Sequence, residues 1–398
     1  MFKRAKFYMI IFAIIFINFL TLDFLLIDVE KTALIVAIGV DKVDNEYEVT
    51  AQIAVPEASN QSTKSNESVI YAKGKTIYDA INEIGVRTGW YPKLAFCNLI
   101  ILGNGVFEEN VMSVIDFFIR SYKVEDSAIL CASETTAKEV LLSISPLDNI
   151  SSFALSKIFV RDHNNASSVL TTTVKEFSKL YYSYCKMGYM PVVKMVETKD
   201  KGDNTSQASS LTDNSGKSSE KDKNTPVVYD AETCYIFNNG YKIASLNNSE
   251  TLFLSLFEKK ANESYFSLEI ANDNESNKNY LIAIKKVNSN IKLKFNKNTP
   301  YLMAKINLSL QIIDTDFSQS MEEIKKIGRL DENTLRLCEK HIETTLLNLY
   351  NKTARLDCDV FEVKNMLFRF HNDKFLKNQN DILLKTIPEF KIIAKNYI

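Results

Sequence analysis

Residues 32–55, TALIVAIGVDKVDNEYEVTAQIAV, carry the clearest strand pattern in this chain of 398 residues. An almost unbroken apolar run ends at the turn-forming stretch 41–45, and apolar and polar side chains alternate after it. Val49 belongs to one face of this second run, whereas Glu48 and Thr50 belong to the other. Such alternation is typical of a strand with one buried and one exposed face. The stretch therefore predicts two consecutive strands, the second of them half-buried.

The rest of the chain mixes helical and strand patterns. Thr76 and Asp79 form a capping-box pattern ahead of an apolar stripe that starts at Ile77, which predicts a helix. The clearest helix has apolar or small residues every three or four positions, at Leu335, Cys338, Ile342, Leu346, Leu349 and Thr353. Helices are predicted over residues 107–122, 137–144, 150–159, 174–185, from 249 onward and over 332–356; further strands are predicted over 99–102, 128–132, 233–237, 241–246, 265–270, 280–287, 291–295 and 302–313. Because a strict βαβ repeat is missing, this pattern favours an α+β fold of mixed sheets flanked by helices.

Residues 197–226 differ sharply in composition from their surroundings. Ala208 and Leu211 are their only apolar residues. A segment this polar cannot bury enough surface to offset its ordering entropy, so it is predicted to be a flexible linker. It would separate an N-terminal α+β domain, residues 29–196, from a C-terminal α+β region, residues 227–398. The latter is divisible into subdomains of about 227–300 and 301–398.

The N-terminus has the pattern of a membrane anchor. Lys3, Arg4 and Lys6 precede a mainly apolar run over residues 7–27. As a helix of about 31 Å, this run matches a hydrocarbon core of about 30 Å. A cleaved signal peptide would instead need a small-x-small cleavage site, and none follows the run. We therefore expect residues 1–28 to form a cytoplasmic N-terminus and an uncleaved signal-anchor helix, with the rest of the chain outside the cytoplasm.

Charge and glycine content exclude several classes of function. The chain has 48 Lys and Arg against 49 Asp and Glu, so no overall basic field would attract nucleic acid. Only 11 glycines are present, which argues against sites built from glycine-rich loops. Gly74, Lys75 and Thr76 match the end of a phosphate-binding loop, but Val69 stands where that motif needs its first glycine. A turn followed by a helix cap explains these residues without a phosphate.

Residue types that often perform catalysis or bind metals are scattered. They are Cys97, Cys131, Cys185, Cys234, Cys338 and Cys358, with His163, His341 and His371. None shows a metal-ligand spacing. The cysteines are interpreted as small apolar core residues, with disulfides in an exported chain as the alternative. Since a G-x-S-x-G elbow is also missing, we predict no catalytic, cofactor-binding or metal-binding residue, and we expect the protein not to be an enzyme.

One aromatic cluster stands out. Trp90, Tyr91 and Pro92 interrupt the pattern after the first predicted helix. They would form either a contact patch on the surface or part of a buried domain corner. Burial at a corner is the expectation, because large aromatic side chains dominate protein cores.

Several segments, in one order along the chain, resemble the C subunit of GerA-type spore germinant receptors, the GerAC family. Gly39, Val40 and Asp41 fill a G-I-D pattern at the end of an apolar strand. The other segments are residues 72–81 (AKGKTIYDAI), residues 114–124 with Asp116, Phe117, Phe118 and Arg120, residues 234–256, and the corner Cys358, Asp359, Val360 and Phe361. The resemblance runs from about residue 24 to the C-terminus.

The departures from the family pattern concern anchoring and two glycines. The family's lipobox cysteine would fall at Asp23, and no cysteine precedes Cys97, so the resemblance implies anchoring by the helix instead of a lipid. Glu362 stands where the family prefers glycine, and Ser245 replaces a common glycine at the exit of a hairpin.

The resemblance implies a three-domain α+β ectodomain beside an A subunit and a transporter-like B subunit. The expected function is that of a non-catalytic C subunit of a GerA-type nutrient germinant receptor, acting in receptor assembly or signal transmission during spore germination. Its expected partners are the membrane bilayer and the A and B subunits, with no cofactor and no nucleic acid. Its expected location is the inner spore membrane. The alternative is a membrane-tethered extracytoplasmic solute-binding protein, which would need a concave pocket between its two halves.

Overall fold

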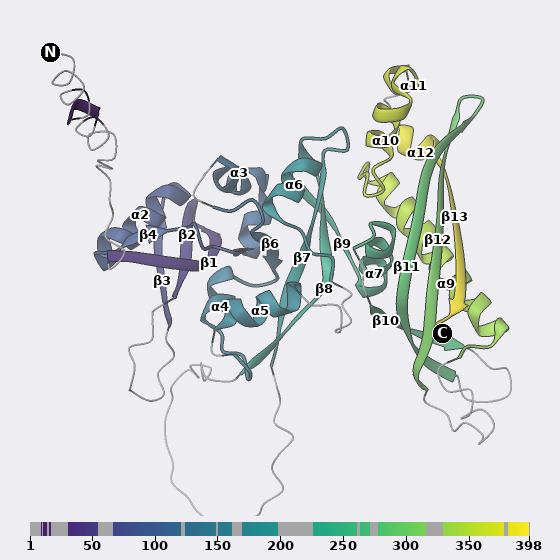
Figure 1. Cartoon of the computed structure of the whole chain (residues 1–398), viewed down its shortest axis with the longest axis horizontal. Coiled ribbons are helices and arrows are strands. Elements are labelled where there is room, and N and C mark those ends of the chain that lie inside the picture. Colours follow the sequence, from purple (N-terminus) through teal and green to yellow (C-terminus); the bar gives the residue numbers. More distant parts are fainter. Residues whose placement is uncertain are drawn as a thin grey trace, which may run out of the picture.

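The computed structural model of the chain describes residues 31–54, 67–120, 124–148, 150–160, 169–197, 226–260, 263–270, 278–315, 329–377 and 381–397, together with residues 9, 11–13 and 16. Two β-sheets, each with its own helices, lie side by side along the longest axis of the molecule (Figure 1). We call them the first unit, residues 31–246, and the second unit, residues 247–397. This mixture of sheets and helices confirms the predicted α+β class.

The sheet of the first unit is mixed. Its strands are β1 (Thr32–Val43), β2 (Glu46–Ala54), β3 (Glu67–Gly74), β4 (Tyr91–Lys93), β5 (Leu99–Leu102), β6 (Ile129–Ser133), β7 (Met187–Glu197), β8 (Val227–Asn238) and β9 (Tyr241–Leu246). Their order is β3-β2-β1-β5-β6-β7-β8-β9, with β4 paired to the start of β1. The central strands β1, β5, β6 and β7 are parallel, and antiparallel strands extend the sheet on both sides.

The predicted strand pair at the start of the chain is present, but its turn is shorter than expected. β1 continues to Val43, and Asp44 and Asn45 alone form the turn, with φ angles of 50° and 63°. Two consecutive residues with positive φ are typical of a type I′ hairpin, whose twist matches that of the flanking strands. Asp41, predicted to lie in the turn, is therefore a buried residue of β1.

The prediction of a half-buried β2 is wrong, because helices cover both faces of the sheet. The helices of the first unit are α2 (Ile77–Thr88), the 3-10 helix η2 (Asn104–Glu108), α3 (Met112–Arg120), α4 (Ala137–Leu142), α5 (Ser151–Phe159) and α6 (Val174–Tyr181). One face packs against α2, α3 and α6, and the other packs against α4 and α5. Gln52, on the face predicted to be exposed, is buried and donates to Ser151 Oγ at 3.2 Å. Glu48 on the same face pairs with Lys138 at 3.2 Å.

Local capping decides where these helices begin. The Thr76 side chain accepts a hydrogen bond from the backbone N of Asp79 at 3.1 Å, which confirms the predicted start of α2. α3 begins at Met112 and not near residue 107, because the Asn110 side chain accepts from the backbone N of Met112 at 2.9 Å. An Asn in this position satisfies an otherwise free backbone N–H of the first helical turn.

The first sheet contains strands from both sides of the polar segment, where composition predicts a boundary between two domains. β7 ends at Glu197, β8 begins at Val227, and these two residues pair in an antiparallel ladder. The polar segment thus connects two neighbouring strands of one sheet, and β8 and β9 lie in the same sheet as the N-terminal strands. Residues 198–225 of the predicted linker lie outside the described part of the chain.

The second unit is a four-stranded sheet with helices. Its strands are β10 (Ser264–Ile270), β11 (Lys278–Asn296), β12 (Thr299–Thr315) and β13 (Ile387–Asn396), in that spatial order. The two strands predicted over 280–287 and 291–295 are one strand, because residues 288–290 continue the ladder with β12. A subdomain boundary at residue 300 would cut the tight β11–β12 hairpin. β13, parallel to β12, was not predicted.

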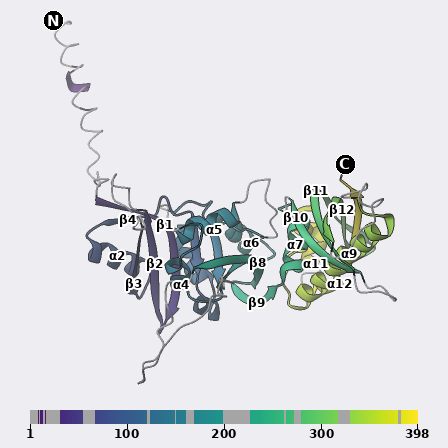
Figure 2. The same ribbon diagram turned by 90° about the horizontal axis from the view of Figure 1, so that it is seen from below.

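The longest helix lies along this second sheet, as predicted. The helices of the second unit are α7 (Asn248–Phe257), α9 (Glu332–Arg355), α10 (Val363–Phe370), α11 (Asn372–Lys377) and α12 (Ile382–Lys385). Figure 2 shows α9 against the sheet. Five residues of its predicted stripe, Cys338, Ile342, Leu346, Leu349 and Thr353, are buried, whereas Leu335 is only partly buried. This side of α9 therefore supplies much of the second core.

Two further expectations concern the cysteines and the anchor. All six cysteines are buried and free, which confirms the interpretation as core residues over the disulfide alternative. The predicted anchor over residues 7–27 lies mostly outside the described residues. Within the described part of the chain, no helix is both long and apolar enough to cross a membrane. Of the run itself, Met9, Phe12 and Phe16 are described as helical and exposed.

Candidate functional site

Two aspartates from the segments discussed above, Asp41 and Asp359, occupy the same kind of position. Each is a buried carboxylate that accepts backbone hydrogen bonds at the start of a helix. Asp41 serves a helix distant in sequence within the first unit, and Asp359 serves a helix of its own corner in the second unit. The Asp359 carboxylate also contacts the first unit, so it lies at the junction between the two units.

Asp41 fixes α4 onto β1. Its carboxylate accepts from the backbone N of Ala137 at 2.8 Å and of Lys138 at 3.0 Å. Burial raises the pKa of Asp41 above its ordinary value, and these two hydrogen bonds oppose that rise. Gly39 and Gly103 provide the space, because a Cβ at Gly39 would lie 2.9 Å from the Ala137 Cβ and one at Gly103 would overlap the Asp41 carboxylate. The G-V-D residues thus have a structural role.

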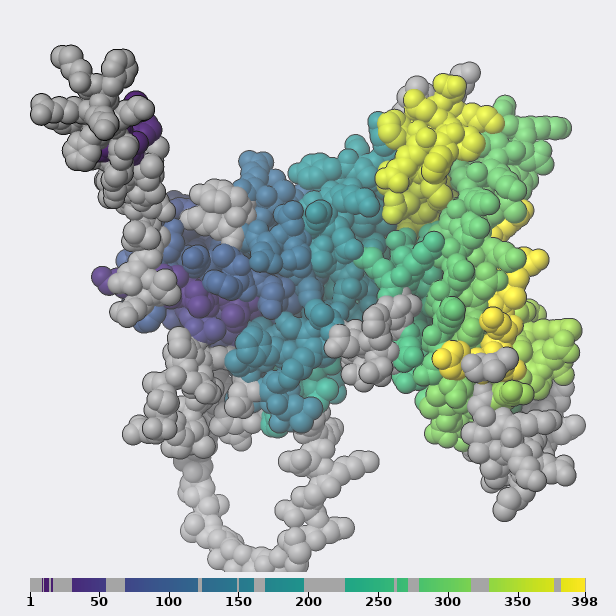
Figure 3. Space-filling model, viewed as in Figure 1, coloured from purple at the N-terminus to yellow at the C-terminus, as the bar shows by residue number. Residues whose placement is uncertain are grey.

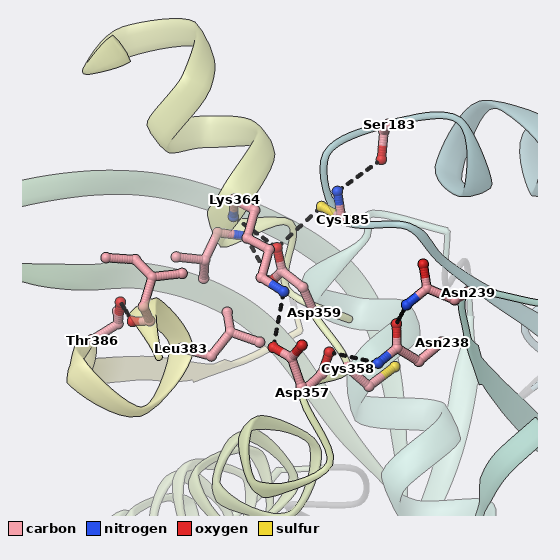
Figure 4. Close-up of polar contacts among 12 residues, drawn as sticks. Ser183, Cys185, Asn238, Asn239, Asp357, Cys358, Asp359, Lys364, Leu383 and Thr386 are labelled. Carbon is pink, nitrogen blue, oxygen red and sulfur yellow. Dashed lines mark hydrogen bonds and ion pairs between the residues drawn. The ribbon is translucent and has the colours of Figure 1, made fainter. Parts of the chain in front are cut away.

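Asp359 connects the two units (Figure 4). Its carboxylate accepts from the backbone N of Val363 at 2.8 Å and of Lys364 at 2.7 Å, at the start of α10. The thiol of Cys185, from the loop between α6 and β7 of the first unit, donates to it at 3.0 Å. Burial raises the pKa of Asp359 to about 6, although the hydrogen bonds from Cys185 and the helix backbone favour the charged form.

The β8–β9 turn adds a second set of contacts beside Asp359. The Asn238 side chain donates to the backbone carbonyl of Asp357 at 3.1 Å, and the Cys358 thiol lies 3.5 Å from the backbone carbonyl of Phe237. Lys364 Nζ pairs with the Asp357 carboxylate at 2.9 Å. The two residues before Asp359 are therefore held by the first sheet.

Aromatic and aliphatic side chains complete the junction. The ring of Tyr184 lies 3.9 Å from that of Phe368 and 5.2 Å from that of Phe375, measured between centroids. Cys185 and Val363 belong to one continuous hydrophobic cluster with residues of both units. In the space-filling view, the yellow surface of α10 and α11 lies directly on the teal surface of the first unit (Figure 3). The junction is thus a filled interface.

Charged residues form one rim of the junction. Lys260 Nζ pairs with Glu176 of α6 at 3.0 Å and donates to the backbone carbonyl of Thr171 at 3.1 Å. Burial, with a further contribution from the charge of Glu362, raises the pKa of Glu258 to about 7. Glu258 in this rim is therefore a carboxyl that ionises near neutral pH.

Comparisons with known proteins identify the family. The model of the spore germination protein N-terminal domain matches residues 27–195, and the model described as spore germination B3/GerAC like, C-terminal, matches residues 233–394. The chain belongs to the GerAC family of spore germination proteins. Among solved structures, the crystal structure of the GerBC protein is similar in fold, with a TM-score of 0.50 at 15% identity, covering 91% of this chain and 97% of that chain. A search of curated proteins found no match.

The structure explains one of the two departures from the family's glycine pattern, at Glu362, and shows that the other, at Ser245, places no special demand on the backbone. Glu362 lies in the left-handed region with φ of 52°, which glycine adopts without strain. The family's preference for glycine here is thus a backbone requirement, and Glu362 fulfils it while accepting from the Asn365 side chain at 2.9 Å. Ser245, by contrast, lies in β9 and does not have positive φ.

The arrangement around Asp359 holds chain segments together and offers little for chemistry. Burial and the neighbouring Asp359 raise the pKa of the Cys185 thiol well above its ordinary value, so Cys185 stays protonated and is a poor nucleophile. In the part of the chain that the structure describes, no three His, Cys, Asp or Glu side chains gather as a metal site requires. His341 packs against Phe253 and Phe266. His163 lies outside the described residues.

The expectation for the aromatic cluster is wrong. The side chains of Trp90 and Tyr91 are 48% and 40% exposed. Gly89, the C-cap of α2 with φ of 72°, reverses the chain immediately before them, and this turn directs Trp90 away from the core. The left-handed glycine after the helix was the available signal in the sequence.

Proposed function

We propose that this chain is the C subunit of a GerA-type nutrient germinant receptor and that it acts in receptor assembly or signal transmission, without catalysis of its own. The observation that carries this proposal is the match of both GerAC domain models, in order, over most of the chain. The buried, protonated state of Cys185 and the filled surroundings of Asp359 support a mechanical role over a chemical one.

The junction suggests how a signal would pass through such a subunit. Cys185 and Asn238 of the first unit contact the corner that begins α10, and the two units share a hydrophobic cluster. Packed interfaces of this kind transmit displacements as rigid-body movements, because their side chains do not deform continuously. We propose that a partner contacting one unit thereby repositions the other.

The proposed attachment is a single membrane-spanning helix over residues 7–27, with the two units outside the cytoplasm. Support comes from the length and apolarity of this run and from the basic residues before it. The exposed side chains of Met9, Phe12 and Phe16 also fit a helix that meets lipid. The inner spore membrane is the proposed location, and the A and B subunits are the proposed partners.

The alternative of a solute-binding protein is not favoured. Such a protein would need an open pocket with convergent polar groups between its halves. Cys185, Tyr184, Val363 and Phe368 fill the space where the described halves meet. We therefore make no proposal for a solute.

Two measurements test the proposal. Affinity isolation of the tagged full chain from detergent-solubilised spore membranes should recover an A-like and a B-like subunit, identified by mass spectrometry. Isolation from membranes carrying Tyr184→Asp, a change at the junction, serves as the matched comparison. Recovery of the wild-type chain without either subunit, at normal abundance, would contradict the proposal. The anchor is tested by alkaline carbonate extraction, which should leave the chain in the membrane pellet.

A further inference from the structure

An exposed apolar surface lies on the first unit beside the start of β1. Tyr78, Val86, Trp90 and Tyr91 line one open groove of about 970 Å³ together with Phe117 and Arg120. The side chains of Tyr78 and Val86 are 63% and 70% exposed, in addition to those of Trp90 and Tyr91. We call these four residues the aromatic surface. Contiguous exposed apolar residues of this kind mark a site of interaction with a protein or a membrane.

The aromatic surface is held in place by its local structure. Gly89 reverses the chain at the end of α2, and the backbone N of Trp90 donates to Thr88 Oγ1 at 3.2 Å. Gly85 lets the reversed segment return against the helix, because a Cβ there would lie 3.0 Å from the Pro92 ring. The exposure of Trp90 therefore results from a defined turn and not from a frayed chain end.

The position of this surface relative to the proposed anchor limits what can cover it. Tyr91 pairs with Thr32, the first residue of β1, in the β1–β4 ladder. The apolar run ends at Ile27, so only four residues lie between it and Thr32. Even if the chain is fully extended, the five residue steps from Ile27 to Thr32 reach at most about 18 Å. The headgroup layer of each leaflet is itself about 5–8 Å thick.

The composition of the surface fits that layer. Tryptophan and tyrosine are enriched at the membrane–water interface, where their rings meet the apolar boundary and their polar atoms stay hydrated. Arg120, which lines the groove, pairs with Asp116 of the same groove at 2.6 Å, so the exposed Lys93 of β4 supplies the positive charge beside the aromatic surface. Positive charge at this depth is attracted to anionic lipid phosphates.

We infer that the aromatic surface rests in the headgroup layer of the bilayer that holds the anchor, so that the first unit lies against the membrane. This inference depends on the proposed single-pass anchor. A surface for a protein partner would not need to lie next to the point where the chain leaves the membrane. The short distance between the aromatic surface and the proposed anchor thus favours lipid, and not the other subunits, as the partner that covers this surface.

Trp90 makes the inference directly measurable, because it is the only tryptophan of the chain. The full chain is reconstituted, without other subunits, into vesicles of phosphatidylcholine and phosphatidylglycerol. Its emission is compared with that in vesicles whose acyl chains carry bromine close to the headgroups or near the bilayer centre. We expect Trp90 in vesicles to emit at a shorter wavelength than a tryptophan exposed to water. We also expect brominated lipids to reduce this emission, and to reduce it more when the bromines lie close to the headgroups.

A matched variant carries the probe elsewhere. Trp90→Tyr combined with Tyr182→Trp places the tryptophan at an exposed position beside α6, near the junction and away from the start of β1. Its emission should be the same in brominated and ordinary vesicles. Carbonate extraction of the same vesicles tests the anchor separately.

The possible results lead to different conclusions. If the chain resists extraction but Trp90 emission is unaffected by bromine, the inference is overturned while the anchor stands. If the chain is extracted, both the anchor and the inference fail. If Trp90 emission shifts only after the A and B subunits are added, with no bromine quenching, the surface contacts protein and the inference is likewise overturned.

Discussion

Replacing Asp359 with asparagine should change how the stability of the protein depends on pH. Burial raises the pKa of Asp359 from its ordinary 3.8 to about 6. A carboxyl whose pKa is raised by folding binds its proton more tightly in the folded state. Its contribution to stability is therefore complete below pH 3.8 and is lost as the pH rises to about 6. The amide side chain of the variant has no proton to lose in this range, so the variant lacks this dependence.

The size of the effect follows from the shift. A difference of about two pKa units corresponds to about 3 kcal/mol, at 1.36 kcal/mol for each unit. The free energy of unfolding of the wild-type protein, minus that of Asp359→Asn, should fall by about 2 kcal/mol between pH 4 and pH 7, because at pH 4 part of the full amount is already lost as the unfolded carboxyl ionises. Taking the difference removes the titration of distant groups that both proteins share.

The assay is urea unfolding of the full chain in detergent at a series of pH values, followed by circular dichroism and by the fluorescence of Trp90. Because the units share a hydrophobic cluster, the two signals should change together. Asp357→Asn is the matched control, since the Asp357 side chain is 71% exposed and two residues away. If the difference in unfolding free energy between the wild-type protein and Asp359→Asn stays constant from pH 4 to pH 7, Asp359 is not a buried carboxyl group with a raised pKa.

Three further substitutions test other parts of the structure. Leu346→Asp places a carboxylate in the core of the second unit, at a cost of several kcal/mol, and should unfold that unit in circular dichroism; a soluble, folded variant would show that the buried face of α9 is wrongly assigned. Gly103→Ala should lower stability by about 0.5–2 kcal/mol in urea unfolding by displacing the Asp41 cap, and by less in an Asp41→Ala background; equal losses in both would contradict the cap. Glu362→Gln should lower the pKa of Glu258 in an NMR titration, because it removes a neighbouring negative charge, and an unchanged pKa would exclude that contribution.

Local sequence patterns predicted where helices, strands and turns lie better than they predicted which strands pair with one another. The Thr76 cap of α2 and the buried stripe of α9 were predicted correctly, and a turn after β1 was predicted although it is shorter than expected; each of these features depends on residues within a few positions of one another. The pairing of β7 with β8 joins residues on both sides of a long polar segment, and composition alone suggested a domain boundary there. β13 also escaped prediction, because it is recognisable only through its parallel pairing with β12.

The same reason explains why the junction was not predicted. Asp41 accepts from Ala137, 96 residues later, and Cys185 donates to Asp359, 174 residues later. The resemblance to the GerAC family selected both aspartates as part of its pattern, but their role appears only when their partners are in place. The exposure of Trp90 could have been predicted, since Gly89 at the end of α2 is a local signal for a chain reversal.

Nutrient-triggered germination of a strain that lacks this gene, and that has no redundant receptor, tests the proposed receptor role most directly. We expect spores of this strain to respond poorly to nutrient, and the wild-type gene supplied in trans to restore the response. Unchanged germination of the deletion strain would contradict the assignment of this chain as a germinant receptor subunit.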